Sequence, residues 1–240
     1  MIFHLHRKEL APAWLEGFSP NGRWLLFWED TQNSASLAAD GLPLVALPLA
    51  GGRPKVMTGE LHYRDYLTWC GSKLVFVLNH GGREVTLGDG IATASGPDWK
   101  PETILPAKGK ISWTSVACPT QAAAARGGGG LVVAGGPAGN DEPFGHEHRS
   151  LWMVAAEPHA TPQQLSQTVP PVGYSDELPM WSGDGRWILF VRTRGGGIGR
   201  GKLYALDPFR GDVVGPIASV GASGNYYGAY SWASQIDWHR

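Results

Sequence analysis

The chain has 240 residues, of which 42% are hydrophobic, and it carries 34 glycines, 18 prolines and a formal charge of −1. Its lysines and arginines form no basic stripe, which argues against nucleic acid as a partner. No apolar run approaches the ~20 residues of a membrane span, so membrane insertion is not expected. This composition fits a single all-β domain over residues 1–240, with many short strands and turns.

A hexapeptide near the N-terminus returns near the C-terminus. Gly-Arg-Trp-Leu-Leu-Phe at residues 22–27 reappears as Gly-Arg-Trp-Ile-Leu-Phe at residues 185–190. The first copy follows a Ser-Pro-Asn-Gly turn, where Pro presets φ and Gly accepts a positive φ. Residues 24–28 are apolar at every position, which predicts a strand buried on both faces. A chain that repeats itself over such a distance is built from stacked copies of one small unit.

Each unit is predicted to contain two hairpins, and therefore four strands. Further apolar runs of strand length follow in chain order, and they are separated by turns that contain glycine. These runs span residues 44–47, 74–78, 85–87, 131–134, 151–154 and 203–206. We find no convincing helix, because the best candidate, residues 121–126, is Ala-rich but runs into four glycines.

The position after the leading aromatic of each unit marks the period of the repeat. It is occupied by Ser19, Cys70, Ser182 and Ala233, with Cys118 as a weaker member of the series. Successive markers lie roughly 50 residues apart, with one longer interval, and this spacing is typical of propeller blades. The fold is therefore predicted to be a β-propeller of four-stranded antiparallel blades.

The two ends of the chain match different halves of a blade. Residues 2–5 (Ile-Phe-His-Leu) resemble a third strand, whereas Trp232 and Trp238 have the spacing of a first hairpin. Pairing the terminal strands of a ring removes its open edges. We therefore expect about five blades, four of them complete and one composite N/C-terminal blade. The alternative is an incomplete part of a larger propeller.

Residues 18–27 and 181–190 resemble the W-S-P-D-G-x-x-I-x-F core of TolB-like (WD-like) β-propeller repeats. The resemblance is partial over residues 69–77 and faint over residues 116–133, and Asn21 and Gly183 replace the Asp and Pro of the pattern. It implies a toroid of four-stranded blades. It also implies a protein that binds other proteins or peptides, or the propeller domain of a larger enzyme.

Catalytic motifs and cofactor sites are not found in the sequence. The nucleophile pattern G-x-S-x-G has no match, since residues 221–225 fail at the last position. Residues 196–202 satisfy G-x-x-x-x-G-K, but Leu203 stands where Ser or Thr would bind Mg²⁺, and a strand follows instead of a helix. We therefore predict a non-enzymatic scaffold that binds a protein or peptide through its loop face or central channel. The alternative is an accessory or substrate-gating propeller of a multidomain, peptidase-like hydrolase whose catalytic domain lies outside this chain.

Two segments are candidates for binding. Asp141, Glu142, His146 and His148 combine carboxylates with a His-x-His pair, which on a strand would point the same way and suit zinc. A solvated loop is the alternative that we favour there, because Gly and Pro flank the segment. Tyr226 and Tyr227 precede the last aromatic cluster and are candidates for a partner surface, because exposed aromatics make binding hot spots.

The two cysteines, Cys70 and Cys118, are predicted to be free buried thiols, because a disulfide framework normally needs more cysteines in a smaller domain. The N-terminus has no apolar h-region after its first residues, so the default location is the cytoplasm. If the chain derives from an exported parent, the location would instead be periplasmic or extracellular. The oligomeric state is left open.

Overall fold

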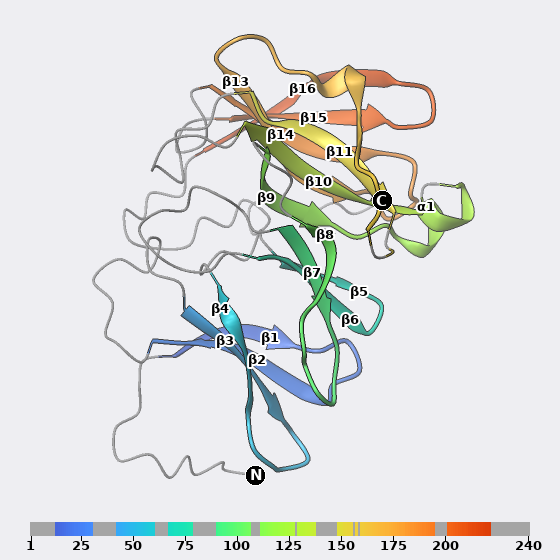
Figure 1. The fold of residues 1–240 in the computed structure, drawn as a ribbon. Helices are drawn as coiled ribbons and strands as arrows, with labels where there is room; N and C mark the ends of the chain where they lie inside the picture. Colours follow the sequence, from blue (N-terminus) through green and yellow to red (C-terminus); the bar gives the residue numbers. More distant parts are fainter. Residues whose placement is uncertain are drawn as a thin grey trace.

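The structure, a computed structural model, describes residues 13–30, 42–60, 67–78, 90–106, 111–127, 129–137, 148–155, 157, 159–194 and 201–221. These residues form four antiparallel sheets of four strands, and the strands of each sheet lie side by side in sequence order. The sheets follow one another from β1–β4 at the bottom of Figure 1 to β13–β16 at the top. The predicted all-β architecture of four-stranded antiparallel blades is confirmed, and we number the sheets as blades 1 to 4.

Blade 1 contains the first copy of the repeated hexapeptide. Leu26 and Trp28 of its second strand are buried, whereas Leu25 and Phe27 on the other face are only half-buried. The prediction that both faces of this strand are buried is therefore confirmed for one face only. The strands of blade 1 are β1 (Ala13–Phe18), β2 (Trp24–Glu29), β3 (Leu42–Pro48) and β4 (Lys55–Glu60).

Blade 2 has the shortest turn between its first two strands. Its third strand begins at Gly90, and the predicted strand at residues 85–87 lies outside the described residues. Its strands are β5 (Leu67–Cys70), β6 (Lys73–Val77), β7 (Gly90–Ala94) and β8 (Glu102–Pro106).

Blades 3 and 4 contain the strands predicted at 131–134, 151–154 and 203–206. The second copy of the hexapeptide leads into β14, as the repeat predicted. Blade 3 is made of β9 (Ile111–Ala117), β10 (Gly130–Pro137), β11 (Ser150–Ala155) and β12 (Gln163–Gln164). Blade 4 follows the short 3-10 helix η2 (Ser166–Thr168) and is made of β13 (Tyr174–Trp181), β14 (Ile188–Arg194), β15 (Gly201–Asp207) and β16 (Asp212–Val220).

One short helix interrupts the sheets, α1 (Gln121–Ala125), between β9 and β10. The hydroxyl of Thr120 accepts a hydrogen bond of 3.1 Å from the Ala123 amide and caps the helix N-terminus. The alanine run is thus helical after all, but it ends at the glycines that argued against a helix. No helix among the residues placed in this structure is long and apolar enough to span a bilayer.

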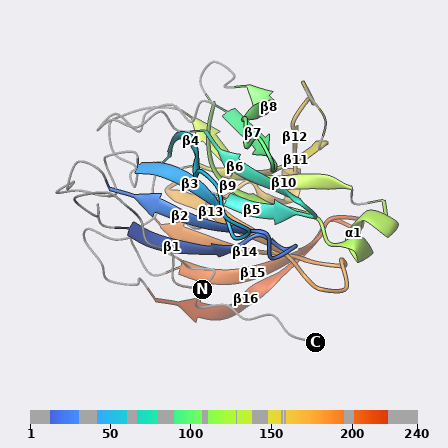
Figure 2. The same cartoon turned by 90° about the horizontal axis from the view of Figure 1, so that it is seen from below.

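Adjacent blades are held together by side chains that alternate along the second strand of each blade. On β6, Leu74 and Phe76 join a hydrophobic cluster with blade 1, while Val75 and Val77 join another with blade 3. The second strand of blade 3 repeats this alternation toward blades 2 and 4. Figure 2 views the stack from below, with the sheets overlying one another. The blade-to-blade core therefore follows from the continuous apolar runs seen in the sequence.

The outward face of blade 1 differs from these covered interfaces. Leu15, Phe27, Val45 and Val56 pair across its four strands and so share the face that points away from blade 2. Leu15 is 59% exposed and Val56 is 62% exposed. The described sheets thus form a partial propeller with an apolar face at one end.

Ring closure rests on segments that the structure does not describe. Residues 2–5 and the aromatic pair Trp232 and Trp238 all lie outside the described residues. The composite blade therefore stays a prediction, as does its alternative, a part of a larger propeller.

Candidate functional site

The first turn of a blade is built by its marker serine. In blade 1 the Ser19 hydroxyl donates to Asn21 Oδ1 over 2.7 Å and accepts a hydrogen bond of 3.0 Å from the Trp24 amide. The Asn21 side chain also accepts a hydrogen bond from the Arg23 amide, and Gly22 closes the turn at a φ of 65°. These bonds hold the backbone of the turn in one shape, so the points from which its side chains project are fixed.

Blade 4 reproduces this turn atom by atom. The Ser182 hydroxyl donates to Asp184 Oδ1 over 2.6 Å and accepts from the Trp187 amide over 2.9 Å. The replacement of Asp by Asn21 in blade 1 leaves the geometry unchanged, because both side chains offer the same acceptor oxygen. The two turns are therefore matched positions for comparing variants.

A groove opens between the turns of blades 1 and 2. Its volume is about 780 Å³, and its lining combines the first turn and the β3–β4 turn of blade 1 with the corresponding turns of blade 2. We call it the turn-face groove. The residues that line it are Ser19, Asn21, Gly22, Arg23, Trp24, Pro48, Leu49 and Ala50 from blade 1, and Ser72, Ser95, Gly96, Pro97 and Trp99 from blade 2.

Two indole rings from different blades meet in this groove. The rings of Trp24 and Trp99 lie edge to face with centroids 5.4 Å apart, and Trp69 contacts Trp99 in the same way at 6.1 Å. A β-carbon at Gly96 would lie 2.7 Å from Trp24 Nε1, so glycine is what lets the ring approach the β7–β8 turn. The indole rings therefore pack closely in the apolar part of the groove, and the absence of a side chain at Gly96 makes room for Trp24.

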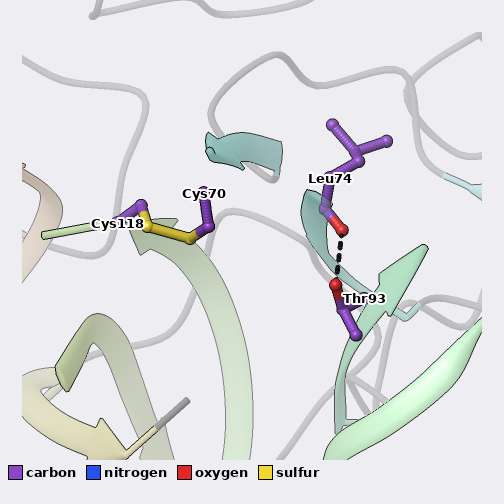
Figure 3. The surroundings of a disulfide bond; sticks show 4 residues. All are labelled: Cys70, Leu74, Thr93 and Cys118. Atoms are coloured by element: carbon purple, nitrogen blue, oxygen red, sulfur yellow. Dashed lines mark hydrogen bonds between the residues drawn. A yellow bond between two sulfur atoms is a disulfide. The ribbon is translucent and has the colours of Figure 1, made fainter. Parts of the chain in front are cut away.

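A disulfide lies beside the groove and joins blades 2 and 3. Cys70 and Cys118 are bonded, with their Cα atoms 5.4 Å apart, so the prediction of free thiols is wrong (Figure 3). Both cysteines occupy the marker position at the end of a first strand, and β5 and β9 contact each other. The error arose because the composition argument ignored that equivalent ends of neighbouring blades converge.

The disulfide lies near a side-chain hydrogen bond that joins two strands of blade 2. Beside it, as Figure 3 shows, the Thr93 hydroxyl donates a hydrogen bond of 3.1 Å to the Leu74 carbonyl and so ties β7 to β6. Cys70 is two residues from Ser72, which lines the turn-face groove. The bridge therefore anchors one wall of the groove to blade 3.

Two ion pairs hold the start of β13. Arg192 donates two hydrogen bonds, of 2.6 and 2.7 Å, to the two carboxylate oxygens of Asp176, which is fully buried. Burial raises the pKa of Asp176 to about 6, against the lowering effect of Arg192. Arg149 of blade 3 donates to Glu177 over 2.9 Å, so this second pair bridges the two blades. The first pair lies within blade 4 and the second joins blades 3 and 4, whereas the groove lies between blades 1 and 2.

Solved structures with this architecture were found by comparison. TolB from Acinetobacter baumannii matches 90% of this chain with a TM-score of 0.50 at 11% sequence identity. The fold is that of a TolB-like β-propeller. The chain spans 45% of the length of that protein.

Two peptidases also contain a part similar to this TolB-like propeller. A puromycin-hydrolyzing peptidase from Mycobacterium tuberculosis matches 83% of the chain with a TM-score of 0.51 and 16% identity, and the chain spans 28% of its length. A prolyl endopeptidase matches 84% with a TM-score of 0.50 and 12% identity, over 26% of its length. At these identities the likeness concerns the fold alone. No protein-family model matches the sequence, and a search of curated proteins gives no match.

Of the predicted metal ligands in this TolB-like propeller, His148 is the one that the structure describes. It is exposed two residues before β11, at a φ of 69°, and its amide donates to the Tyr174 carbonyl over 2.9 Å. It lines a pocket of about 440 Å³ together with Ser150, Trp152 and Gln164. Asp141, Glu142 and His146 lie outside the described residues, within which no group of three possible metal ligands occurs. The metal site stays a prediction.

The remaining predicted segments of the TolB-like propeller are only partly described. Tyr226 and Tyr227 lie outside the described residues. Of the glycine-rich segment 196–202, Gly201 and Lys202 begin strand β15, in agreement with the prediction that a strand follows.

Sequence reasoning did not find the turn-face groove. Its residues come from four turns in two blades, and the repeat marked only those of the first turn of blade 1, residues 19–24. That Trp24 and Trp99 are in contact can be known only from how blade 1 packs against blade 2.

Proposed function

We propose that this chain is a non-enzymatic propeller scaffold that binds a protein or peptide segment in the turn-face groove. The observation that carries the proposal is the groove itself, in which the half-buried indole of Trp24 lies among polar turn residues and packs against the buried Trp99 of blade 2. Aromatic rings bury a large area at a small entropy cost, which makes them effective anchors for a partner. The hydrogen-bonded first turn supplies a rigid wall, so little order has to be gained on binding.

The alternative is an accessory or substrate-gating propeller of a multidomain hydrolase. It is supported by the likeness to parts of two peptidases, of which this chain covers about a quarter. Under this alternative the catalytic domain lies outside the chain. A hydrolase domain encoded in an extension of the reading frame, or in the neighbouring frame, would favour this alternative over the scaffold.

We also propose that the protein works in an oxidising compartment, as the product of an exported parent. The Cys70–Cys118 disulfide supports this location, because such bonds persist mainly in secreted and periplasmic proteins and are rare in the cytosol. It replaces the cytoplasmic default, which rested on the N-terminal sequence.

Selection from a phage-displayed library of random short peptides tests the scaffold proposal. Peptides that bind the wild type would then be measured against Ser72→Trp, which places an indole in the groove, and against Gly183→Trp as a matched control. Gly183 lies in the blade 4 turn, outside the groove, and a β-carbon added there would meet no atom within 4 Å. We expect Ser72→Trp to weaken binding by at least about tenfold, equivalent to about 1.4 kcal/mol, and Gly183→Trp to leave it unchanged. A library that yields no binder, or equal binding by both variants, would refute the proposal.

A further inference from the structure

We infer that the turn-face groove selects peptide segments that carry a carboxylate next to a bulky apolar side chain. This inference rests on the proposed function and gives the chemical class of its ligand. It follows from the positive charge of Arg23 in the groove, from the exposure of the Arg23 guanidinium, and from the apolar surface beside it.

Among the described residues that line the groove, Arg23 is the one that is charged, and none of them carries a carboxylate. A single cation beside an apolar surface attracts a negatively charged group and repels a positive one. One cation is too few for a nucleic-acid backbone, which is gripped by clustered lysines and arginines. The charge complementarity therefore favours an acidic side chain or a C-terminal carboxylate on a peptide.

The Arg23 side chain is available for such a contact. Its backbone is fixed, because its amide donates to Asn21 Oδ1 and its carbonyl accepts from the Leu49 amide. Its guanidinium is exposed and makes no hydrogen bond or ion pair with any residue that the structure describes. The backbone of Arg23 is thus held in place, while no residue in the described ranges occupies the five guanidinium donors that a ligand could bond to.

The matching residue of blade 4 is engaged differently. Arg186 occupies the same position of the repeat, yet its guanidinium lies 5.4 Å from the ring centroid of Trp187, above that ring. In blade 1 the corresponding ring, Trp24, contacts Trp99 of the next blade. The arginine at this repeat position therefore contacts the tryptophan of its own turn in blade 4, whereas in blade 1 it lines a groove.

The apolar half of the ligand follows from the surface next to Arg23. Trp24 is half-buried, and Pro48 and Pro97 flank it from the two blades. Flat and rigid rings of this kind take up aromatic, aliphatic or proline side chains with little loss of entropy. The hydroxyls of Ser72 and Ser95, which also line the groove, can bond to the backbone of an extended peptide.

The test uses peptides chosen from the library above, each made in an acidic form and in an amide form, with Asn or Gln for Asp or Glu and a C-terminal amide for a C-terminal carboxylate. Binding to the full chain is measured by fluorescence anisotropy for the wild type, for Arg23→Gln and for Arg186→Gln as the control. Both arginines are exposed, so both variants should fold. We expect the wild type and Arg186→Gln to prefer the acidic form by about fivefold, the upper range for an exposed ion pair, and Arg23→Gln to lose that preference.

The outcomes separate this inference from the proposed function. If the acidic and amide forms bind the wild type equally, or if Arg23→Gln keeps the preference, the inference is wrong while peptide binding in the groove still stands. If no peptide binds, or if Ser72→Trp does not weaken binding, the proposed function fails and this inference fails with it.

Discussion

Asp176 and Arg192 face each other across β13 and β14, and two hydrogen bonds of 2.6 and 2.7 Å join the guanidinium to both carboxylate oxygens. The arginine side chain also covers the ring of Tyr204, with its guanidinium carbon 5.0 Å from the ring centroid. Hydrogen bonding to Asp176 raises the pKa of Arg192 above its usual value. At neutral pH the pair is therefore ionised. The buried carboxylate has lost its hydration, and this loss is unfavourable to folding.

This pair predicts a specific dependence of stability on pH. Burial raises the pKa of Asp176 from 3.8 to about 6 in the folded protein, so the folded state binds this proton more tightly than the unfolded chain. The resulting stabilisation is fully present below pH 3.8 and is lost as the pH rises through about 6. It amounts to about 3 kcal/mol.

Urea unfolding between pH 4 and 7 checks this prediction. The stability of the wild type relative to Asp176→Asn should fall as the pH rises over that range, because the variant has no carboxyl to titrate. Asp212→Asn, an exposed control on β16, should follow the wild type at every pH. A wild-type advantage that does not change with pH would contradict the expected proton uptake.

The disulfide should contribute strongly to stability. It closes a loop of 48 residues between blades 2 and 3, for which the chain-entropy relation gives about 4 kcal/mol. We expect the Cys70→Ser, Cys118→Ser double variant to unfold at a lower urea concentration and to be insensitive to reductant. The oxidised wild type should lose stability when reductant is added. Identical midpoints with and without reductant would show that the bond is not formed.

Two glycines at matched turn positions should respond differently to alanine. Gly22 and Gly185 have φ values of 65° and 66°, but a β-carbon at Gly22 meets no atom, whereas one at Gly185 overlaps the backbone of Ala123 in α1. Gly22→Ala should cost about 1 kcal/mol from the strained backbone alone. Gly185→Ala should cost more than about 3 kcal/mol, because α1 must move. Equal losses in urea unfolding would mean that α1 does not pack against this turn.

The loop that contains His146 should behave as a solvated segment. Calorimetric titration with zinc is therefore expected to give no saturable heat, and His146→Ala should be indistinguishable from the wild type. Saturable heat that disappears in His146→Ala would establish the metal site instead.

The sequence predicted those parts of the fold that depend on local patterns. The apolar runs 44–47 and 203–206 are strands because turn residues bound them and because neighbouring blades bury them. The third strand of blade 2 was not predicted, since Gly90–Ala94 consists, apart from Ile91, of small residues with a weak apolar signal. A strand could thus be predicted from the sequence where its buried side chains are large, and was missed where they are small.

Features formed between blades were beyond prediction from one chain. The bond between Cys70 and Cys118 requires knowing that the ends of β5 and β9 converge, and spacing along the chain does not reveal this. The groove likewise requires the register of the first turn of blade 1 against the β7–β8 turn of blade 2. The sequence did identify the serine-centred turns, and these turns supply one wall of the groove.

The Cys70–Cys118 bond has a practical consequence for handling the protein. A protease that cuts the chain once between these two residues leaves both pieces covalently attached. Such a nicked sample would migrate as one intact species on a denaturing gel without reductant, and only a reduced gel would show the two fragments.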